Sequence, residues 1–275
     1  MEPADFYTGI VVDAYARLKS SSFDASLYRD FVVAHGQPGL EIGCGDGQPL
    51  LDLRTQGLEV EGVDSSSDML LCCHENARQR GVGVRLHHQR VEDLALDRRF
   101  PSIYFAGPTF TLLADDEVAR RALLAIRAHL TDDGMALIPL WIPDPTPAEE
   151  LGVCRSHDDG LGVEVRYTPV SEASDAVGRT RITSSRYERV TSTGTQVAER
   201  EWVIHWQTPL SFTRLCSETG LDLVRLVDDD TASAATDAST SFTATVRRSF
   251  QQSTVNLAKG RAQHAAPIEQ VQGHR

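Results

Sequence analysis

The chain lacks long apolar runs. No stretch of its 275 residues approaches the roughly 18 consecutive apolar residues that a transmembrane helix needs, so we predict no membrane span and no membrane partner. The first residues, 1–5, contain neither a basic region nor an apolar core. We therefore expect no secretory signal peptide at this end.

Positive charge is also scarce. The chain has 27 lysines and arginines against 39 aspartates and glutamates, which gives a formal net charge of −12. A surface of this sign repels nucleic acid and anionic membranes, and the arginines are scattered rather than clustered. We therefore expect no nucleic-acid partner.

Cysteine is sparse and shows no pattern. The five cysteines form no C-x-x-C pair and no Cys/His spacing typical of zinc sites; they are Cys44, Cys72, Cys73, Cys154 and Cys216. We predict that all five are reduced, that no metal is bound, and that the protein is cytoplasmic.

Glycine stands at every second position in one short stretch. Residues 40–47, LEIGCGDG, predict a short strand that runs into a loop with glycine at positions 43, 45 and 47, and Pro49 favours a helix start just beyond. Glycines allow a ligand to approach the bare backbone, and the following helix presents free N–H groups. The stretch therefore predicts a ligand-binding loop.

Asp64 provides the second half of the predicted site. It ends an apolar run, 58–63, and lies twenty-one residues after Gly43. A carboxylate at the tip of the second strand, at this distance, is suited to a ribose diol, which predicts a nucleoside-binding α/β domain. The dinucleotide fingerprint G-x-G-x-x-G would need glycine where Gln48 stands, which argues against a nicotinamide oxidoreductase.

Three sequence blocks in order resemble a known family. Residues 41–47, EIGCGDG, resemble motif I of the class I S-adenosylmethionine-dependent methyltransferases. Residues 62–70, GVDSSSDML, resemble the second block of the family, and residues 128–134, AHLTDDG, resemble the helix end and turn before strand five. The resemblance covers roughly residues 5–250. It implies an α/β, Rossmann-like fold with a seven-stranded, mostly parallel sheet and helices on both faces.

The predicted organisation has five parts. A helical N-terminal leader (1–36) precedes the S-adenosylmethionine-binding core (37–147), and an inserted antiparallel β unit (148–207) follows as an acceptor lid or a dimer surface. Residues 208–250 then supply a helix and strands six and seven of the core sheet, and residues 251–275 lack apolar periodicity and are expected to be a disordered tail. Within the insertion we expect three strands, at 163–170, 179–190 and 196–207.

The resemblance implies S-adenosylmethionine as cofactor, with S-adenosylhomocysteine as product. Asp64 would hold the ribose hydroxyls, and Glu41 would order the loop near the amino-acid end of the cofactor. Arg90 stands where the family often has an acid near the adenine amine, so Gln89 or a backbone carbonyl is the alternative contact, or Arg90 points to solvent. In the leader, Tyr15 and Tyr28 either reach the methionine carboxylate or the substrate, or pack the leader onto the core. The cofactor-binding candidates are Tyr15, Tyr28, Glu41, Gly43, Cys44, Gly45, Gly47, Asp64, Ser65, Met69, Gln89, Arg90, Val91 and Ala106.

The acceptor site is expected above strands four and five, beneath the insertion. The substrate candidates are Phe110, Trp141, Trp202 and Trp206, although the last two also suit a core or a dimer seam. No catalytic residue is evident. His205 is a candidate general base for a hydroxyl acceptor, or merely a polar residue on a strand, and Tyr15 is a second candidate.

These features predict an S-adenosylmethionine-dependent transfer of a methyl group to the oxygen or nitrogen of a small molecule. The leader and the insertion resemble those of bacterial enzymes that methylate sugar amines and secondary metabolites. Residues 106–110 lack the Asn/Asp-Pro-Pro-aromatic motif of enzymes that methylate nucleic-acid amines. The alternatives are a protein methyltransferase and a regulatory module that binds the cofactor without turnover, and a homodimer remains open.

Overall fold

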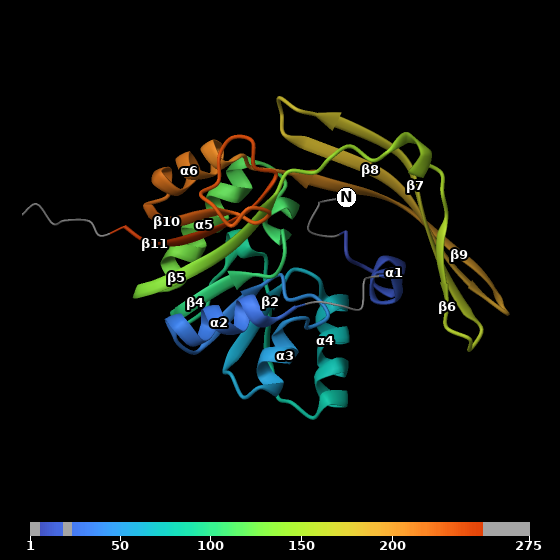
Figure 1. The fold of residues 1–275 in the computed structure, drawn as a ribbon. Coiled ribbons are helices and arrows are strands. Elements are labelled where there is room, and N and C mark those ends of the chain that lie inside the picture. The colour runs from blue at the N-terminus through green and yellow to red at the C-terminus, as the bar shows by residue number, and fades with distance from the viewer. Residues whose placement is uncertain (1–5, 19–23, 250–275) are drawn as a thin grey trace, which may run out of the picture.

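The computed structural model describes residues 6–18 and 24–249, which form two sheets and their covering helices (Figure 1). The larger sheet has the order β10-β11-β5-β4-β1-β2-β3, with β1 to β5 parallel and β11 antiparallel to both neighbours. Its strands are β1 (Gly39–Ile42), β2 (Val60–Asp64), β3 (Arg85–His88), β4 (Phe100–Phe105), β5 (Leu130–Trp141), β10 (Leu221–Asp228) and β11 (Ser241–Arg248). The predicted seven-stranded, mostly parallel sheet is confirmed; the expected disordered tail, 251–275, lies outside the described residues.

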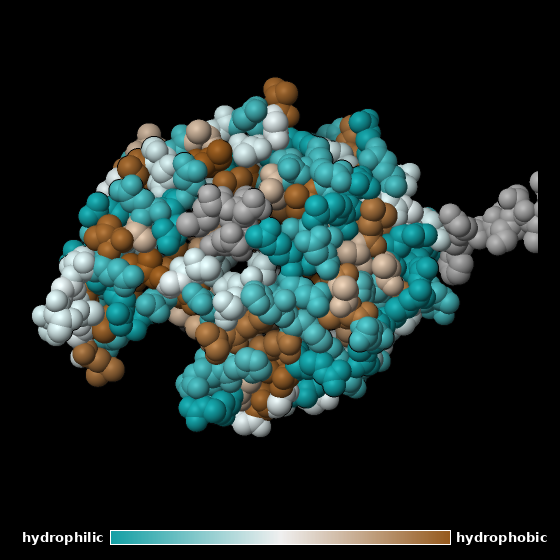
Figure 2. Space-filling view, turned by 180° about the vertical axis from the view of Figure 1, so that it is seen from behind, coloured by the Kyte–Doolittle hydropathy of each residue, from teal (hydrophilic) through white to brown (hydrophobic). Residues whose placement is uncertain are grey.

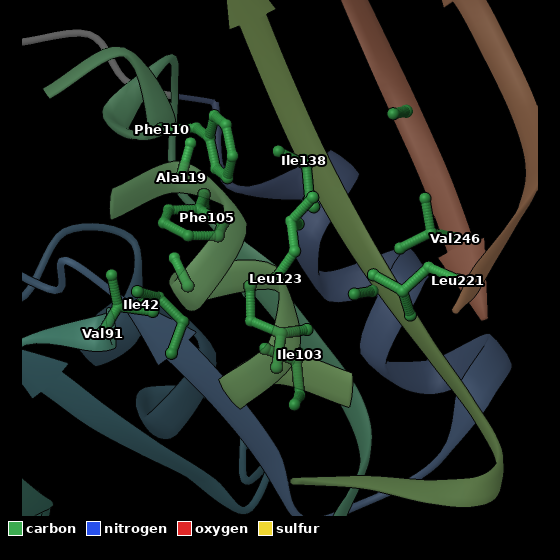
Figure 3. Close-up of a cluster of buried hydrophobic side chains, with 14 of the residues drawn as sticks. Ile42, Val91, Ile103, Phe105, Phe110, Ala119, Leu123, Ile138, Leu221 and Val246 are labelled. Atoms are coloured by element: carbon green, nitrogen blue, oxygen red, sulfur yellow. The ribbon is translucent and has the colours of Figure 1, made fainter. Parts of the chain in front are cut away.

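Helices cover both faces of this sheet (Figure 1). On one face lie α2 (Ser26–His35), α3 (Leu50–Thr55) and α4 (Ser67–Arg80), and on the other lie α5 (Asp116–His129) and α6 (Pro209–Glu218). The short helical turns are η2 (Val91–Asp93), η3 (Thr109–Leu112) and η4 (Ala148–Glu150). On the α5 face, Phe105, Leu123 and Ile138 belong to one buried cluster (Figure 3). None of the helices within these residues is long and apolar enough to span a membrane.

The helix ends follow local sequence signals. Ser66 caps α4, because its Oγ accepts a 3.1 Å hydrogen bond from the Met69 N–H, and Gly81 ends the helix with a φ of +67°. Thr208 and Ser211 form a reciprocal capping box at the start of α6. The helix after the glycine loop, α3, begins at Leu50, directly after Pro49, where the sequence predicted a helix start.

Strand β5 differs from its prediction. A turn was expected at 128–134, with the strand starting at residue 135, but β5 already begins at Leu130. Leu130 pairs with Phe100 and Met135 pairs with Ser102, so the intervening residues bulge out of the ladder. The polar residues that favoured a turn are thus accommodated within the strand.

The insertion forms a separate antiparallel sheet of order β6-β7-β8-β9 (Figure 1). Its strands are β6 (Arg155–Asp158), β7 (Val163–Asp175), β8 (Thr180–Thr191) and β9 (Gly194–His205). Three strands were expected here. The fourth, β6, consists of four exposed polar residues, so it carries no alternation that could have predicted it.

The leader helix α1 (Ile10–Leu18) packs on the insertion. Phe6, Ile10 and Val11 are buried in one cluster with Val165 of β7 and Tyr187 of β8. Arg17 at the end of α1 forms a 2.9 Å ion pair with Asp159. Seen from behind, the insertion projects from one side of the core (Figure 2).

Candidate functional site

A cavity lies at the carboxyl ends of β1, β2 and β4, where α/β sheets bind their ligands. The leader contributes Tyr7 and Tyr15 to its wall, and the core supplies the rest. The core residues are Ile42, Gly43, Gly45, Val63, Asp64, Ser65, Met69, Gln89, Arg90, Val91, Glu92, Phe105, Thr109, Leu112 and Leu113. Most of the expected cofactor-binding residues are therefore brought together.

Gly43 gives the loop after β1 its shape. Its φ is +70°, and a Cβ at this position would lie 2.5 Å from Cγ2 of Thr109. Its N–H donates a 2.8 Å hydrogen bond to the Val63 carbonyl at the end of β2. Only glycine satisfies both constraints, so the loop passes close to β2 and leaves its backbone facing the cavity.

Backbone N–H groups fix the Asp64 carboxylate. Its Oδ2 accepts a 2.7 Å hydrogen bond from the Gly45 N–H, and its Oδ1 accepts a 2.8 Å bond from the Ser66 N–H. Burial raises the pKa of this carboxyl, and the bonds from Ser66 and Gly45 oppose that rise. The carboxylate borders the cavity and keeps acceptor capacity, so Asp64 can accept a hydrogen bond from a hydroxyl group of a ligand.

Glu41 lies behind the loop and is fully buried. Its Oε2 accepts a 2.7 Å hydrogen bond from the Tyr104 hydroxyl, whereas its Oε1 has no hydrogen-bond partner among the described residues. Burial raises the pKa of this carboxyl well above its usual range. Glu41 does not line the cavity, so contact with a ligand would need a bridging water.

The wall near β3 differs in detail from the sequence prediction. The Gln89 side chain is engaged by its own loop, because its Oε1 accepts a 2.8 Å hydrogen bond from the Ala95 N–H. Arg90 and Val91 both line the cavity, and so does Glu92, two residues after the position where the family often has an acid. Glu92 thus supplies a carboxylate to this wall that the motif alone did not reveal.

Two expected cofactor contacts near the β4 loop lie outside the cavity lining. Tyr28 is buried, and its hydroxyl oxygen accepts a 2.7 Å hydrogen bond from the Gly107 N–H. The carbonyl of Ala106 accepts a 2.7 Å hydrogen bond from the Thr109 hydroxyl. Both residues therefore shape the loop after β4.

Cys44 and Gly47 also lie outside the cavity lining and instead pack the loop onto its helices. The Cys44 side chain is buried, and its hydrogen bond to Cys73, together with burial, raises the pKa of its thiol. A Cβ at Gly47 would lie 2.7 Å from Leu51 and 2.8 Å from the Cys73 sulfur. A nucleophilic role for Cys44 has no support from this environment.

The acceptor candidates are dispersed, and none of them lines the cavity. Phe110 points into the core, with its ring centre 5.5 Å from that of Phe105 (Figure 3). Trp202 stacks on Phe6 of the leader at 6.4 Å, and Trp206 is buried beyond the end of β9. Trp141 borders a separate groove. In the described part of the chain, no insertion residue reaches the cavity wall, so the leader covers it instead.

The two candidate catalytic side chains differ in position. His205 is buried outside the cavity, with Nε2 3.5 Å from Oδ1 of Asp116, and burial lowers its pKa. Tyr15 lines the cavity, and burial, followed by the charge of Asp46, raises its pKa to about 12. Tyr15 therefore stays protonated at neutral pH and can donate a hydrogen bond there.

Sequence reasoning missed several residues of the wall. Tyr7 packs edge-on against Tyr15 at 5.6 Å, and Leu112 and Leu113 enter from the end of η3 and the residue after it. None of these residues belongs to a motif, and only the tertiary fold brings them to the cavity. Within residues 6–18 and 24–249, no cluster of three or more His, Cys, Asp or Glu side chains is arranged to hold a metal.

Comparisons with known proteins match this architecture. Residues 40–134 match the family model described as a methyltransferase domain. A dTDP-3-amino-3,6-dideoxy-α-D-glucopyranose N,N-dimethyltransferase of Streptomyces fradiae is 33% identical over 106 residues, which are 38% of this chain and 40% of that protein. The curated relatives are thus matched over less than half of their length.

Two solved structures have the same fold over most of their length. A methyltransferase of Streptomyces caelestis superposes with a TM-score of 0.69 and 20% identity, covering 90% of this chain and 99% of that one. An amino pentose methyltransferase from Micromonospora echinaspora, solved with SAM bound, gives a TM-score of 0.59 and 21% identity over 88% and 98% of the two chains. At this level of identity, the two similarities show the fold of the chain and no more.

Proposed function

We propose that this chain transfers a methyl group from S-adenosylmethionine to the nitrogen or oxygen of a small molecule. Residues 40–134 match a methyltransferase domain, and the chain has the fold of the class I S-adenosylmethionine-dependent methyltransferases. A secondary metabolite or an amino sugar is the proposed acceptor. The support is the match to an amino-sugar N,N-dimethyltransferase together with a cavity built from the glycine loop and Asp64.

The residues present fit S-adenosylmethionine. Asp64 would hold the ribose hydroxyls, the Gly43–Gly45 backbone would lie along the amino-acid end, and Ser65 and Met69 would flank the adenine. The unpartnered Oε1 of Glu41 is a buried polar atom that a water bridging to the amino-acid end of the cofactor would satisfy. The bound cofactor would supply a methyl group already activated on a sulfonium sulfur.

The chemical task of the chain is then to position the acceptor. A lone pair of the acceptor must point at the methyl carbon in line with the C–S bond; as the new bond forms, the electrons of the C–S bond stay on sulfur. Tyr7 and Tyr15 form the leader side of the cavity wall, and the Tyr15 hydroxyl keeps its proton at neutral pH because its pKa is raised to about 12.

The cavity lining favours nitrogen as the acceptor atom. A hydroxyl acceptor needs a base near the reacting oxygen, but the described lining contains no histidine, and its carboxylates are Asp64 and Glu92. Both carboxylates belong to the proposed adenosine end. An amine that arrives unprotonated needs only a route by which the proton leaves afterwards, so this observation carries the proposal of N-methylation.

The test is turnover with defined acceptors. Purified protein should convert S-adenosylmethionine and dTDP-3-amino-3,6-dideoxy-α-D-glucopyranose into S-adenosylhomocysteine and a methylated sugar. Mass spectrometry detects both products. Methylation of a peptide mixture instead would favour a protein methyltransferase. Tight S-adenosylhomocysteine binding without turnover of an amine, alcohol or peptide panel would favour a regulatory module.

We also propose a cytoplasmic location and a homodimer that assembles through the insertion, with no nucleic-acid or membrane partner. The support is the net charge of −12 and the projecting sheet of 148–207, whose β9 is an edge strand. Sedimentation of the purified protein tests the dimer, and a monomer at micromolar concentration would contradict it.

A further inference from the structure

A second hollow lies across the loop that follows β4. This groove of about 640 Å³, which we name the Trp141 groove, is bordered by Leu27, Pro108, Leu140, Trp141, Asp229 and Ser241. Its volume falls within the range of roughly 300–1,000 Å³ typical of small-molecule sites. It is formed at the carboxyl ends of β4 and β5, where the acceptor was expected.

One loop separates the Trp141 groove from the cofactor cavity. Gly107 and Pro108 border the groove, while the next residue, Thr109, lines the cavity. Helix α2 holds this loop in place, because the Gly107 N–H donates a 2.7 Å hydrogen bond to the Tyr28 hydroxyl oxygen. A molecule whose reacting atom enters the cavity over this loop can therefore extend its remainder into the groove.

The Trp141 ring is a firmly held apolar surface. The guanidinium carbon of Arg181 lies 5.4 Å from the ring centre. Arg181 is itself fixed, since it donates a 2.7 Å hydrogen bond to the Asp144 carbonyl and lies 3.6 Å from the Glu172 carboxylate. Leu27, which is 48% exposed, adds apolar area to the same groove. Such a ring offers a flat face to the C–H face of another ring.

The polar side of the groove carries negative charge only. Asp229 accepts a 2.9 Å hydrogen bond from the Ser241 hydroxyl, and its own N–H donates a 3.0 Å bond to the Ser241 carbonyl. No lysine or arginine is among the described residues that border the groove. A carboxylate accepts hydrogen bonds from hydroxyl groups and repels phosphate.

From this arrangement we propose that the Trp141 groove is the acceptor subsite for the part of the substrate that does not react, and that this part is a neutral ring bearing hydroxyl groups. The ring stacks on Trp141, and its hydroxyls donate to Asp229. Any phosphate on the acceptor lies outside the groove. The inference rests on the proposed function, because it assigns the acceptor of the same reaction.

The experiment measures binding to the full chain saturated with S-adenosylhomocysteine. The probes are methyl 3-amino-3,6-dideoxy-α-D-glucopyranoside and inorganic phosphate, each titrated by NMR or calorimetry. We expect the glycoside to bind, Trp141→Leu to weaken it about tenfold, and Asp229→Asn to weaken it three- to tenfold. Phosphate should not compete. Asp230→Asn, on the same loop but outside the groove lining, should leave binding unchanged.

The outcomes separate the subsite from the function. Absent glycoside binding, or equal binding by wild type, Trp141→Leu and Asp229→Asn, overturns the subsite, even if amines are methylated. Turnover that fails for every acceptor while the glycoside still binds in the groove counts against the methyl transfer and not against the subsite. Trp141→Phe keeps an aromatic face, so retained binding in that variant but not in the folded Trp141→Leu variant supports stacking.

Discussion

The hydroxyl of Tyr104 donates a 2.7 Å hydrogen bond to one carboxylate oxygen of Glu41, and the other oxygen has no hydrogen-bond partner among the described residues. Both side chains are fully buried, on neighbouring strands of the central sheet. A half-satisfied buried carboxyl favours its protonated form, since the proton removes the charge that water no longer solvates.

Glu41 should therefore make stability depend on pH. Its pKa is raised in the folded state above the ordinary value of about 4.3, so the folded protein binds this proton more firmly than the unfolded chain. Stability from this group is fully present below the ordinary pKa and is lost as the pH rises through the raised value. We expect the Glu41→Gln protein to melt at a higher temperature than wild type at pH 8 and with little difference at pH 4. Glu149→Gln, at an exposed site, is the control. The same dependence of melting temperature on pH in both variants would contradict a role for Glu41.

Asp64 should control cofactor affinity. Replacement by alanine removes a charge-assisted acceptor worth about 1.5–3 kcal/mol, so the Kd for S-adenosylhomocysteine should rise about ten- to hundredfold. Because burial raises the pKa of Asp64, wild-type affinity should also fall at acid pH as this carboxyl gains its proton. Calorimetry measures both effects, with Asp133→Asn as an exposed control. Unchanged affinity in Asp64→Ala would remove Asp64 from the site.

Gly43 and Thr109 should behave as a coupled pair. Gly43→Ala places a methyl group 2.5 Å from Cγ2 of Thr109 and forces an L-residue to a φ of +70°. We expect loss of S-adenosylhomocysteine binding by at least tenfold. Thr109→Ala relieves the clash but not the strain at φ, so the double variant should recover part of the affinity. Independent, additive effects in this cycle would show that the two side chains do not meet.

Trp202 should affect ligand binding through the leader, because it supports the residue next to Tyr7. Its ring stacks on Phe6, and Phe6 packs edge-on, at 5.0 Å, against Tyr7 in the cavity wall. Trp202→Ala should lower stability by about 2–4 kcal/mol and weaken S-adenosylhomocysteine binding as well. Thermal melting and calorimetry measure the two effects, with Val197→Ala, an exposed site on the same strand, as control. A less stable protein with unchanged affinity would mean that the position of the leader does not matter for S-adenosylhomocysteine binding.

The parts of the site that could be predicted from sequence are those fixed by local chemistry. Gly43 and Asp64 are at the ends of neighbouring strands, and the constraint on each is a backbone conformation or a charge that its own sequence reveals. Ser66 likewise caps the next helix through a contact three residues away. Features that depend on residues so close in the sequence can be predicted from sequence patterns.

What could not be predicted depends on contacts between distant segments. Phe110 follows β4 as an acceptor residue would, yet its ring packs against Phe212 at 5.6 Å, more than a hundred residues away. Tyr7 reaches the cavity through distant contacts, because the insertion packs against its neighbour Phe6 and the Ser66 hydroxyl donates a hydrogen bond to the Tyr7 carbonyl. Periodicity identifies an apolar face, but it does not identify what covers that face.

The position of the leader also sets an order of assembly. The apolar face of α1 is covered by β7 and β8, which follow it by about 150 residues, as the separation between Arg17 and Asp159 illustrates. During synthesis the glycine loop and Asp64 can fold while this face is still exposed. Until the insertion has left the ribosome, the leader depends on its contacts with the core, where the Ser66 hydroxyl donates to the Tyr7 carbonyl and the Gly9 N–H donates to the Asp68 carboxylate. In a nascent chain arrested before β8, the leader side of the cavity would therefore lack the support of the insertion.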